Sequence, residues 1–255
     1  MSSPHLLLID RQRLEVQRLR LSVSSLRLIS NARHAPTLSV QEGYTTWAAT
    51  YDEMKSGNAM DCPLLERIQS VAWGQLEAVA DLACGTGRPG RWLKAHGVRS
   101  LDGVELTEAM PDQARAKGIY RQLMLADLRH TPLPAHSCDL VNVGLADEHL
   151  PDLLPLYQEA TRLVRSRGSL VVICYHPFFQ LSGVPTTFEQ RPGERVTIEG
   201  YVHLFSDHVQ AANVCGWQLR ELYERLIDEA WVAGRPHAAS RLGWPVSFAC
   251  LWQQR

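Results

Sequence analysis

The stretch from Val79 to Gly90 combines an aspartate with closely spaced glycines and reads Val-Ala-Asp-Leu-Ala-Cys-Gly-Thr-Gly-Arg-Pro-Gly. The apolar run up to Asp81 predicts a strand. Gly85 and Gly87 predict a tight loop in which backbone N–H groups can approach a ligand closely. Pro89 then favours the first turn of a helix. A strand, a glycine loop and a helix in this order are typical of an adenosine-binding site in an α/β sheet.

The charge of Asp81 separates two classes of ligand. A nicotinamide dinucleotide presents a pyrophosphate to such a loop, and a carboxylate at the lip would repel it, although a helix N-terminus favours anions. S-adenosylmethionine (SAM) carries an ammonium and a sulfonium and no phosphate, so a carboxylate at this position favours SAM. Glu105 ends the next apolar run, twenty residues after Gly85, and its two oxygens could accept both ribose hydroxyls of either ligand. In the alternative interpretation, both acids are solvated ends of strands.

Several segments together resemble the successive motifs of class I SAM-dependent methyltransferases, in particular the ubiquinone/menaquinone-biosynthesis-like branch that acts on small molecules. They are residues 81–87, 103–106, 126–128 and 132–141. The resemblance covers about half of the chain, from Val40 to Ile173. It implies that Asp127 binds the adenine amino group, that Leu128 packs on the ring, and that an aromatic N-terminal helix closes over SAM. The cofactor-binding residues expected on this basis are Tyr44, Tyr51, Asp81, Ala83, Gly85, Thr86, Gly87, Glu105, Leu106, Asp127 and Leu128.

The alternation of strand and helix patterns predicts an α/β, Rossmann-like, doubly wound fold with a mostly parallel seven-stranded sheet and helices on both faces. We expect strands near 78–83, 100–105, 121–125, 139–143, 169–175, 217–223 and 246–252, the last two as an antiparallel ending. We expect helices at 89–96, after Thr107, at 150–164 and at 207–214. The pair Pro192-Gly193 predicts the turn of a β-hairpin insertion after strand five.

The domain organisation follows from this pattern. Residues 39–255 are expected to form the methyltransferase domain, with a lid or hairpin insertion at about 176–205 and a second insertion at about 226–243. Residues 1–38 hold six arginines against two acidic residues. This composition fits an N-terminal arm, a start assigned too early, or a mitochondrial targeting segment.

The acceptor side of the site should lie beyond strands four and five and the hairpin. Methyl transfer mainly requires alignment of donor and acceptor. A base is needed only for an alcohol, a phenol or an acidic carbon. His176 is the first candidate for this base and His149 the second. The alternative for each is a structural histidine. The expected substrate-binding residues are Trp47, Glu148, Tyr201, His203 and Trp231.

The composition of the chain limits the remaining classes of function and partner. A formal net charge of −1 gives no support to a nucleic-acid partner, and no apolar run is long enough for a membrane span. The six cysteines form no C-x-x-C pair and the histidines have no tight ligand spacing, so we expect no metal and a cytoplasmic, reducing location.

The predicted function is SAM-dependent O- or C-methylation of a small molecule. The alternatives are a nicotinamide-dependent oxidoreductase, for which no Tyr-x-x-x-Lys is present, and a non-catalytic SAM-binding protein. The acceptor and the oligomeric state are not predicted.

Overall fold

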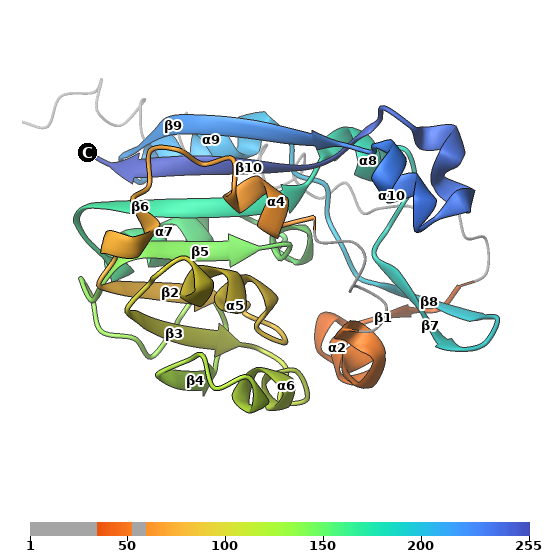
Figure 1. Ribbon diagram of the computed structural model, residues 1–255, viewed down its shortest axis with the longest axis horizontal. Helices are drawn as coiled ribbons and strands as arrows, with labels where there is room; N and C mark the ends of the chain where they lie inside the picture. The colour runs from red at the N-terminus through yellow and green to blue at the C-terminus, as the bar shows by residue number, and fades with distance from the viewer. Residues whose placement is uncertain (1–34, 53–59) are drawn as a thin grey trace, which may run out of the picture.

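The structure, a computed structural model, describes residues 35–52 and 60–255. Its main feature is a seven-stranded sheet in the order β4-β3-β2-β5-β6-β10-β9 (Figure 1). The strands are β2 Ala78–Leu82, β3 Ser100–Glu105, β4 Gln122–Leu125, β5 Cys138–Gly144, β6 Val164–Tyr175, β9 Trp217–Leu226 and β10 Pro245–Gln254. The first five pair in parallel, and β10 is antiparallel to both β6 and β9. The predicted Rossmann-like fold with its antiparallel ending is therefore confirmed.

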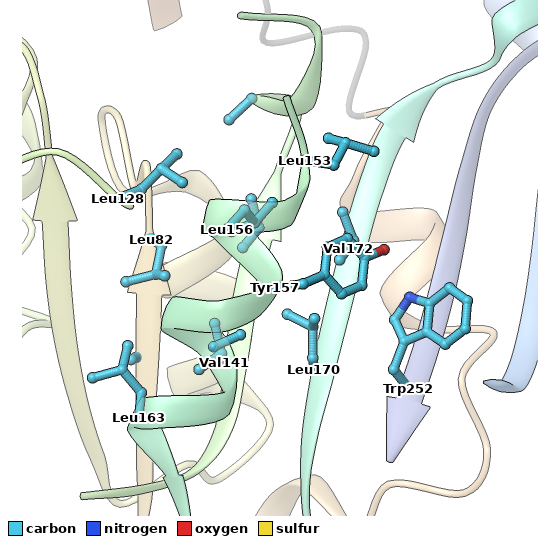
Figure 2. Close-up of a cluster of buried hydrophobic side chains, with 14 of the residues drawn as sticks. Leu82, Leu128, Val141, Leu153, Leu156, Tyr157, Leu163, Leu170, Val172 and Trp252 are labelled. Atoms are coloured by element: carbon cyan, nitrogen blue, oxygen red, sulfur yellow. The ribbon is translucent and has the colours of Figure 1, made fainter. Parts of the chain in front are cut away.

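Helices cover both faces of this sheet. Successive residues of a strand point to opposite faces, so β5 places Val141 and Val143 in one core and Leu140 in the other. Figure 2 shows the first core, where Leu156 of α7 lies near Val141 and Val172. The helices that pack around the sheet are α4 Cys62–Leu65, α5 Arg88–Ala95, α6 Pro111–Ala116, α7 Leu154–Leu163 and α9 Phe205–Val214, with the 3-10 turn η2 Trp73–Gln75.

A second, three-stranded sheet lies beyond the carboxyl ends of the parallel strands (Figure 1). The predicted hairpin is present as β7 Thr187–Arg191 and β8 Glu194–Ile198, and β1 Thr37–Leu38 pairs with β8 in parallel. Helix α2 (Val40–Trp47) and the turn η1 (Ala48–Thr50) follow β1. Gly43 of α2 lies so close to the hairpin that a Cβ there would approach Ile198 to 2.7 Å. The hairpin therefore supports the N-terminal helix.

Several boundaries differ from the prediction. Helix α6 begins at Pro111, not after Thr107, because the residues between form a turn closed by the Met110 N–H and the Thr107 carbonyl, and Pro111 has no N–H to extend it. The strand expected at 169–175 is longer than predicted, since β6 starts at Val164 and pairs with β5 across a register shift. The insertions also contain elements that we did not predict. These are α8 Pro177–Leu181, α10 Glu229–Ala233 and the 3-10 turn η4 Pro236–Arg241.

Most of the expected N-terminal arm lies outside the described residues, which begin at 35. None of the helices in the described part of the chain is long and apolar enough to cross a membrane.

Candidate functional site

A cavity of about 300 Å³ opens at the carboxyl ends of the parallel strands. Its size lies at the lower end of the range for small-molecule sites. Three groups of residues form its wall: the loops after β2, β3 and β4, the segment after β5, and the N-terminal helix α2 with its flanks. They are Ser39, Val40, Gln41, Tyr44, Tyr51, Ala83, Gly85, Glu105, Leu106, Thr107, Met110, Ala126, Asp127, Leu128, Arg129, Gly144, Leu145, Ala146, His149 and Leu150.

The loop after β2 brings the backbone to the cavity. Gly85 and Gly87 both have positive φ, and Gly87 is the N-cap of α5. Ala83 also has a positive φ, of 54°. This conformation is strained for a residue with a Cβ. The glycine loop thus turns as predicted, with one strained alanine in the cavity wall.

Glu105 stands at the end of β3 and is nearly buried. Its carboxylate accepts hydrogen bonds from the Gly85 N–H and the Thr107 N–H, both at 2.9 Å. Burial raises its pKa, against the effect of these backbone donors. Each carboxylate oxygen keeps a further lone pair. Glu105 is therefore fixed at the cavity wall and can still accept hydroxyl donors from a ligand.

Asp127 follows β4 and pairs with Arg129. The Arg129 guanidinium donates to both carboxylate oxygens, at 2.6 Å for the shortest contact, and lowers the pKa of Asp127. Arg129 is the only lysine or arginine among the described residues that line the cavity. A pyrophosphate would meet two carboxylates and a cation that is already paired. The wall instead matches a ligand with hydroxyls and an amine, as SAM has.

Asp81, on which the choice between ligands depended, does not stand at the lip of the loop. It is 1% exposed and is not among the described residues that line the cavity. The Tyr120 hydroxyl donates to Oδ2 at 2.6 Å and the Asn142 amide donates to Oδ1 at 2.7 Å. Burial raises the pKa of Asp81 to about 6. The carboxylate of Asp81 links β2 to β5 through Asn142 and does not separate SAM from a dinucleotide. Glu105, Asp127 and the pairing of Arg129 make that distinction instead.

Tyr44 and His149 meet across the cavity. The Tyr44 hydroxyl lies 2.9 Å from His149 Nε2, and His149 Nδ1 lies 2.8 Å from the Glu199 carbonyl oxygen. A carbonyl can only accept, so Nδ1 carries the proton and Nε2 accepts from Tyr44. Burial lowers the pKa of His149 and raises that of Tyr44, so the pair is neutral. The carboxylate of Glu148 is 3.7 Å from Nε2, where it would stabilise a positive imidazolium.

His176, the first candidate for a base, is in a different environment. Its Nδ1 accepts from the Phe178 N–H at 3.1 Å, which makes it the N-cap of α8. Its Nε2 lies 3.0 Å from a carboxylate oxygen of Glu224. It is 7% exposed and is not among the cavity-lining residues that the structure describes. The expectation that His176 faces the reacting centre is not met, because it caps a helix that we did not predict.

The other expected residues lie behind the wall. Trp47 stacks on Phe188 with the ring centroids 5.0 Å apart. The Thr86 hydroxyl donates to Asp52 at 2.6 Å. His203 Nε2 lies 2.8 Å from the Leu150 carbonyl oxygen.

Tyr201 donates its backbone N–H to the Glu148 carbonyl. Trp231 lies farther off, between the guanidiniums of Arg225 and Arg235. None of these expected substrate-binding side chains is among the described residues that line the cavity.

Sequence reasoning missed the segment Gly144–Ala146 and the start of α2 at Ser39–Gln41, which also line the cavity. The first follows the apolar run of β5 directly, and its position at a strand end is the signal that could have identified it. Ser39 and Glu42 form a capping box, also readable from the sequence. That this helix start faces the cavity depends on the hairpin that supports it.

Comparison with known proteins finds methyltransferases among the proteins similar to this chain. The family described as "Methyltransferase domain" matches residues 80–172. Methyltransferase-like protein 27 of Homo sapiens is 34% identical over 99 residues, which are 36% of this chain and 39% of that protein. Trans-aconitate 2-methyltransferase of Escherichia coli is 30% identical over 115 residues, or 43% of this chain and 44% of that protein. Malonyl-[acyl-carrier protein] O-methyltransferase of Yersinia pestis is 31% identical over 93 residues, or 36% of this chain and 34% of that protein.

Among solved structures, an S-adenosylmethionine-dependent methyltransferase from Mesorhizobium loti has a TM-score of 0.63 at 23% identity and covers 77% of this chain and 99% of that chain. This likeness concerns the fold. The chain spans half or less of the length of the first curated relatives that it matches.

Proposed function

Because the chain contains a class I SAM-dependent methyltransferase domain with S-adenosylmethionine as its cofactor, we propose that it transfers the sulfonium methyl to an oxygen or an acidic carbon of a small molecule. The observation that carries this proposal is the Tyr44–His149 pair in the cavity wall, with His149 neutral and its tautomer fixed by the Glu199 carbonyl. A thiol, with a pKa of about 8.5, needs such a base less than an alcohol or a carbon acid does, because more of it is ionised at neutral pH.

We assign the cofactor contacts to residues of the wall. Glu105 accepts hydrogen bonds from the ribose hydroxyls, Asp127 accepts one from the adenine amine, and Leu128 packs on the adenine ring. The backbone of Ala83 and Gly85 approaches the ligand. Tyr44 and Tyr51 cover it from the side of the N-terminal helix, and Leu106 completes the apolar contact.

The pair can remove a proton from the acceptor. Bound SAM supplies an electrophilic methyl on a sulfonium that leaves as a neutral thioether. The acceptor's O–H or C–H proton passes to the Tyr44 oxygen, while the Tyr44 hydroxyl proton passes to His149 Nε2. The acceptor's electron pair would form the new bond to the methyl carbon that SAM supplies, and the electrons of the broken carbon–sulfur bond would stay on sulfur. Glu148, 3.7 Å from Nε2, stabilises the imidazolium that results.

The names of two relatives support a small acidic acceptor. One is an O-methyltransferase of a malonyl-[acyl-carrier protein] and the other a methyltransferase of trans-aconitate. We therefore include carboxylic acids among the acceptor classes to be tested, although they are ionised at neutral pH and need no base. Phenols, alcohols and activated carbon acids come first, because the Tyr44–His149 pair can remove their proton.

The test measures S-adenosylhomocysteine release with each acceptor class. We expect His149→Ala to lower turnover by about 100-fold or more on a phenol, alcohol or carbon acid, because a positioned base contributes that much, with SAM affinity unchanged. Tyr44→Phe should also slow the reaction, and His96→Ala, at an exposed histidine, should not. Unchanged turnover in His149→Ala would show that His149 does not act as the base. SAM binding without product from any class would instead support a non-catalytic SAM-binding protein.

A further inference from the structure

Three side chains of types that can ligate a metal meet in the core behind the cavity wall. Asp147 belongs to the 3-10 turn η3 (Asp147–His149), Cys174 is near the end of β6, and His208 is in α9. Their ligand atoms all lie within 4.8 Å of one another. The exposed fractions of the three residues are 1%, 0% and 1%.

The contacts within the trio are long, with one near the outer limit of a hydrogen bond to sulfur and the other a long ion pair. His208 Nε2 is 3.6 Å from Asp147 Oδ2 and 3.8 Å from Cys174 Sγ. Within the described residues, Asp147 Oδ1 is buried without a hydrogen-bond partner. A buried carboxylate is costly unless it is paired or coordinates a metal. An ion shared by the three side chains would also give Asp147 Oδ1 a partner.

The separations match those of ligands that share one small ion. Tetrahedral zinc has bonds of about 2.3 Å to sulfur and about 2.0–2.1 Å to nitrogen or oxygen, which puts nitrogen and sulfur about 3.6 Å apart and nitrogen and oxygen about 3.3 Å apart. The distances of 3.8 and 3.6 Å are each only slightly longer.

The surroundings orient His208 for this role. Its Nδ1 lies 3.0 Å from the Tyr157 hydroxyl, which leaves Nε2 directed at the other two ligands. A ligating histidine usually gives its second ring N–H to such a partner. His203 lies next to it, with ring centroids 6.3 Å apart, and its Nε2 lies 2.8 Å from the Leu150 carbonyl oxygen.

We propose that Asp147, Cys174 and His208 form a buried structural zinc site. The mixture of thiolate, imidazole and carboxylate suits zinc rather than calcium or magnesium. Binding replaces the S–H bond of Cys174 with a sulfur–zinc bond and releases the proton to solvent. Because the ligands are buried, the ion enters as the chain folds. It would join η3, which carries His149, to β6 and α9. This differs from our expectation of no metal, and it is independent of the acceptor proposed above.

The test uses the full chain. Zinc content is measured by mass spectrometry on the purified protein, which is then unfolded with a chelator and refolded with Co²⁺. We expect one equivalent of metal and a thiolate-to-cobalt charge-transfer band. Cys174→Ala should lose the band, and Cys138→Ala should keep it, since Cys138 is also buried but its thiol donates to the Leu163 carbonyl and lies outside the trio. Tyr157→Phe should weaken metal affinity by about 10- to 100-fold with the same spectrum.

Two results would overturn the site. One is the absence of stoichiometric metal from the folded wild-type chain under both loading conditions. The other is a thiolate–cobalt band that persists in Cys174→Ala. If Cys174→Ala does not fold, Asp147→Asn serves instead, because it keeps the volume of the side chain and removes one charged ligand. Unchanged cobalt affinity in that variant would also contradict the site.

Discussion

Asp81→Asn should make the protein more stable at neutral pH. Asp81 is buried beneath the glycine loop, and burial raises its pKa from 3.8 to about 6 even though Tyr120 and Asn142 donate hydrogen bonds to it. Desolvation of the charge therefore exceeds the stabilisation by its two partners. Asparagine has the same shape and no charge to desolvate. Its carbonyl can accept from Asn142, and its amide can donate to the Tyr120 oxygen.

The size of the effect follows from linkage. A raised pKa means that the folded state holds the proton more tightly than the unfolded state. The protonated carboxyl is thus favourable below the unfolded pKa near 4, and stability is lost as the pH rises through about 6. A shift of about 2 units corresponds to about 3 kcal/mol once the group is ionised in both states. The advantage of Asp81→Asn should be close to zero at pH 4 and reach about 2–3 kcal/mol above pH 7.

The assay is urea unfolding of the wild type and Asp81→Asn from pH 4 to pH 8, with SAM affinity measured in parallel. Because the two proteins share all other titrating groups, their difference isolates Asp81. A variant that is less stable than the wild type above pH 7 would refute the reasoning, since the ionised carboxylate would then be stabilised in place. We expect SAM affinity to change by less than about threefold, or below about 0.7 kcal/mol. Loss of SAM binding by a more stable variant would restore the direct cation contact expected from the sequence.

Three further changes test other parts of the structure. Glu105→Gln should weaken SAM affinity by about 10- to 100-fold in calorimetry, because its amide turns a donor toward the Gly85 or Thr107 N–H, while Glu108→Gln at an exposed position should not; equal effects would contradict the ribose assignment. His176→Ala should lower the free energy of unfolding by about 1 kcal/mol through loss of the α8 cap and leave turnover of the folded protein unchanged, whereas a specific loss of turnover would make it catalytic after all. Asp61 is buried and pairs at 2.6 Å with the Arg88 guanidinium, whose side chain is 18% exposed. Asp61→Asn should cost about 3 kcal/mol in urea unfolding, the lower end for breaking a buried pair, because it removes the counter-charge of Arg88; a cost below about 1 kcal/mol would show that water solvates the guanidinium.

The fold could be predicted largely from local patterns. Apolar runs that end in a glycine loop or an acidic residue marked the parallel strands, and the ends of such strands meet at one edge of the sheet. This is why Glu105 and Asp127 were expected at the site and do line the cavity. The Pro192-Gly193 turn marked the hairpin, and Gly193 has the positive φ that it requires.

What the sequence could not predict depends on contacts between distant segments. The burial of Asp81 comes from Tyr120 and Asn142, which belong to other elements. The same limit applies to His176, since only the structure shows the short helix that it caps. Likewise, the pairing of β1 with β8 and the meeting of Tyr44 with His149 join segments far apart in the chain. Side-chain type at a strand end predicts position near the site, but not the direction in which the side chain points.

The most direct test of the central claim is calorimetric titration of the purified chain with SAM, beside S-adenosylhomocysteine and NADH. The cavity has two carboxylates in its wall and a single arginine that is already paired. We therefore expect saturable binding of SAM and S-adenosylhomocysteine at one site per chain, and none of NADH. Binding of NADH, or no binding of SAM, would contradict the account.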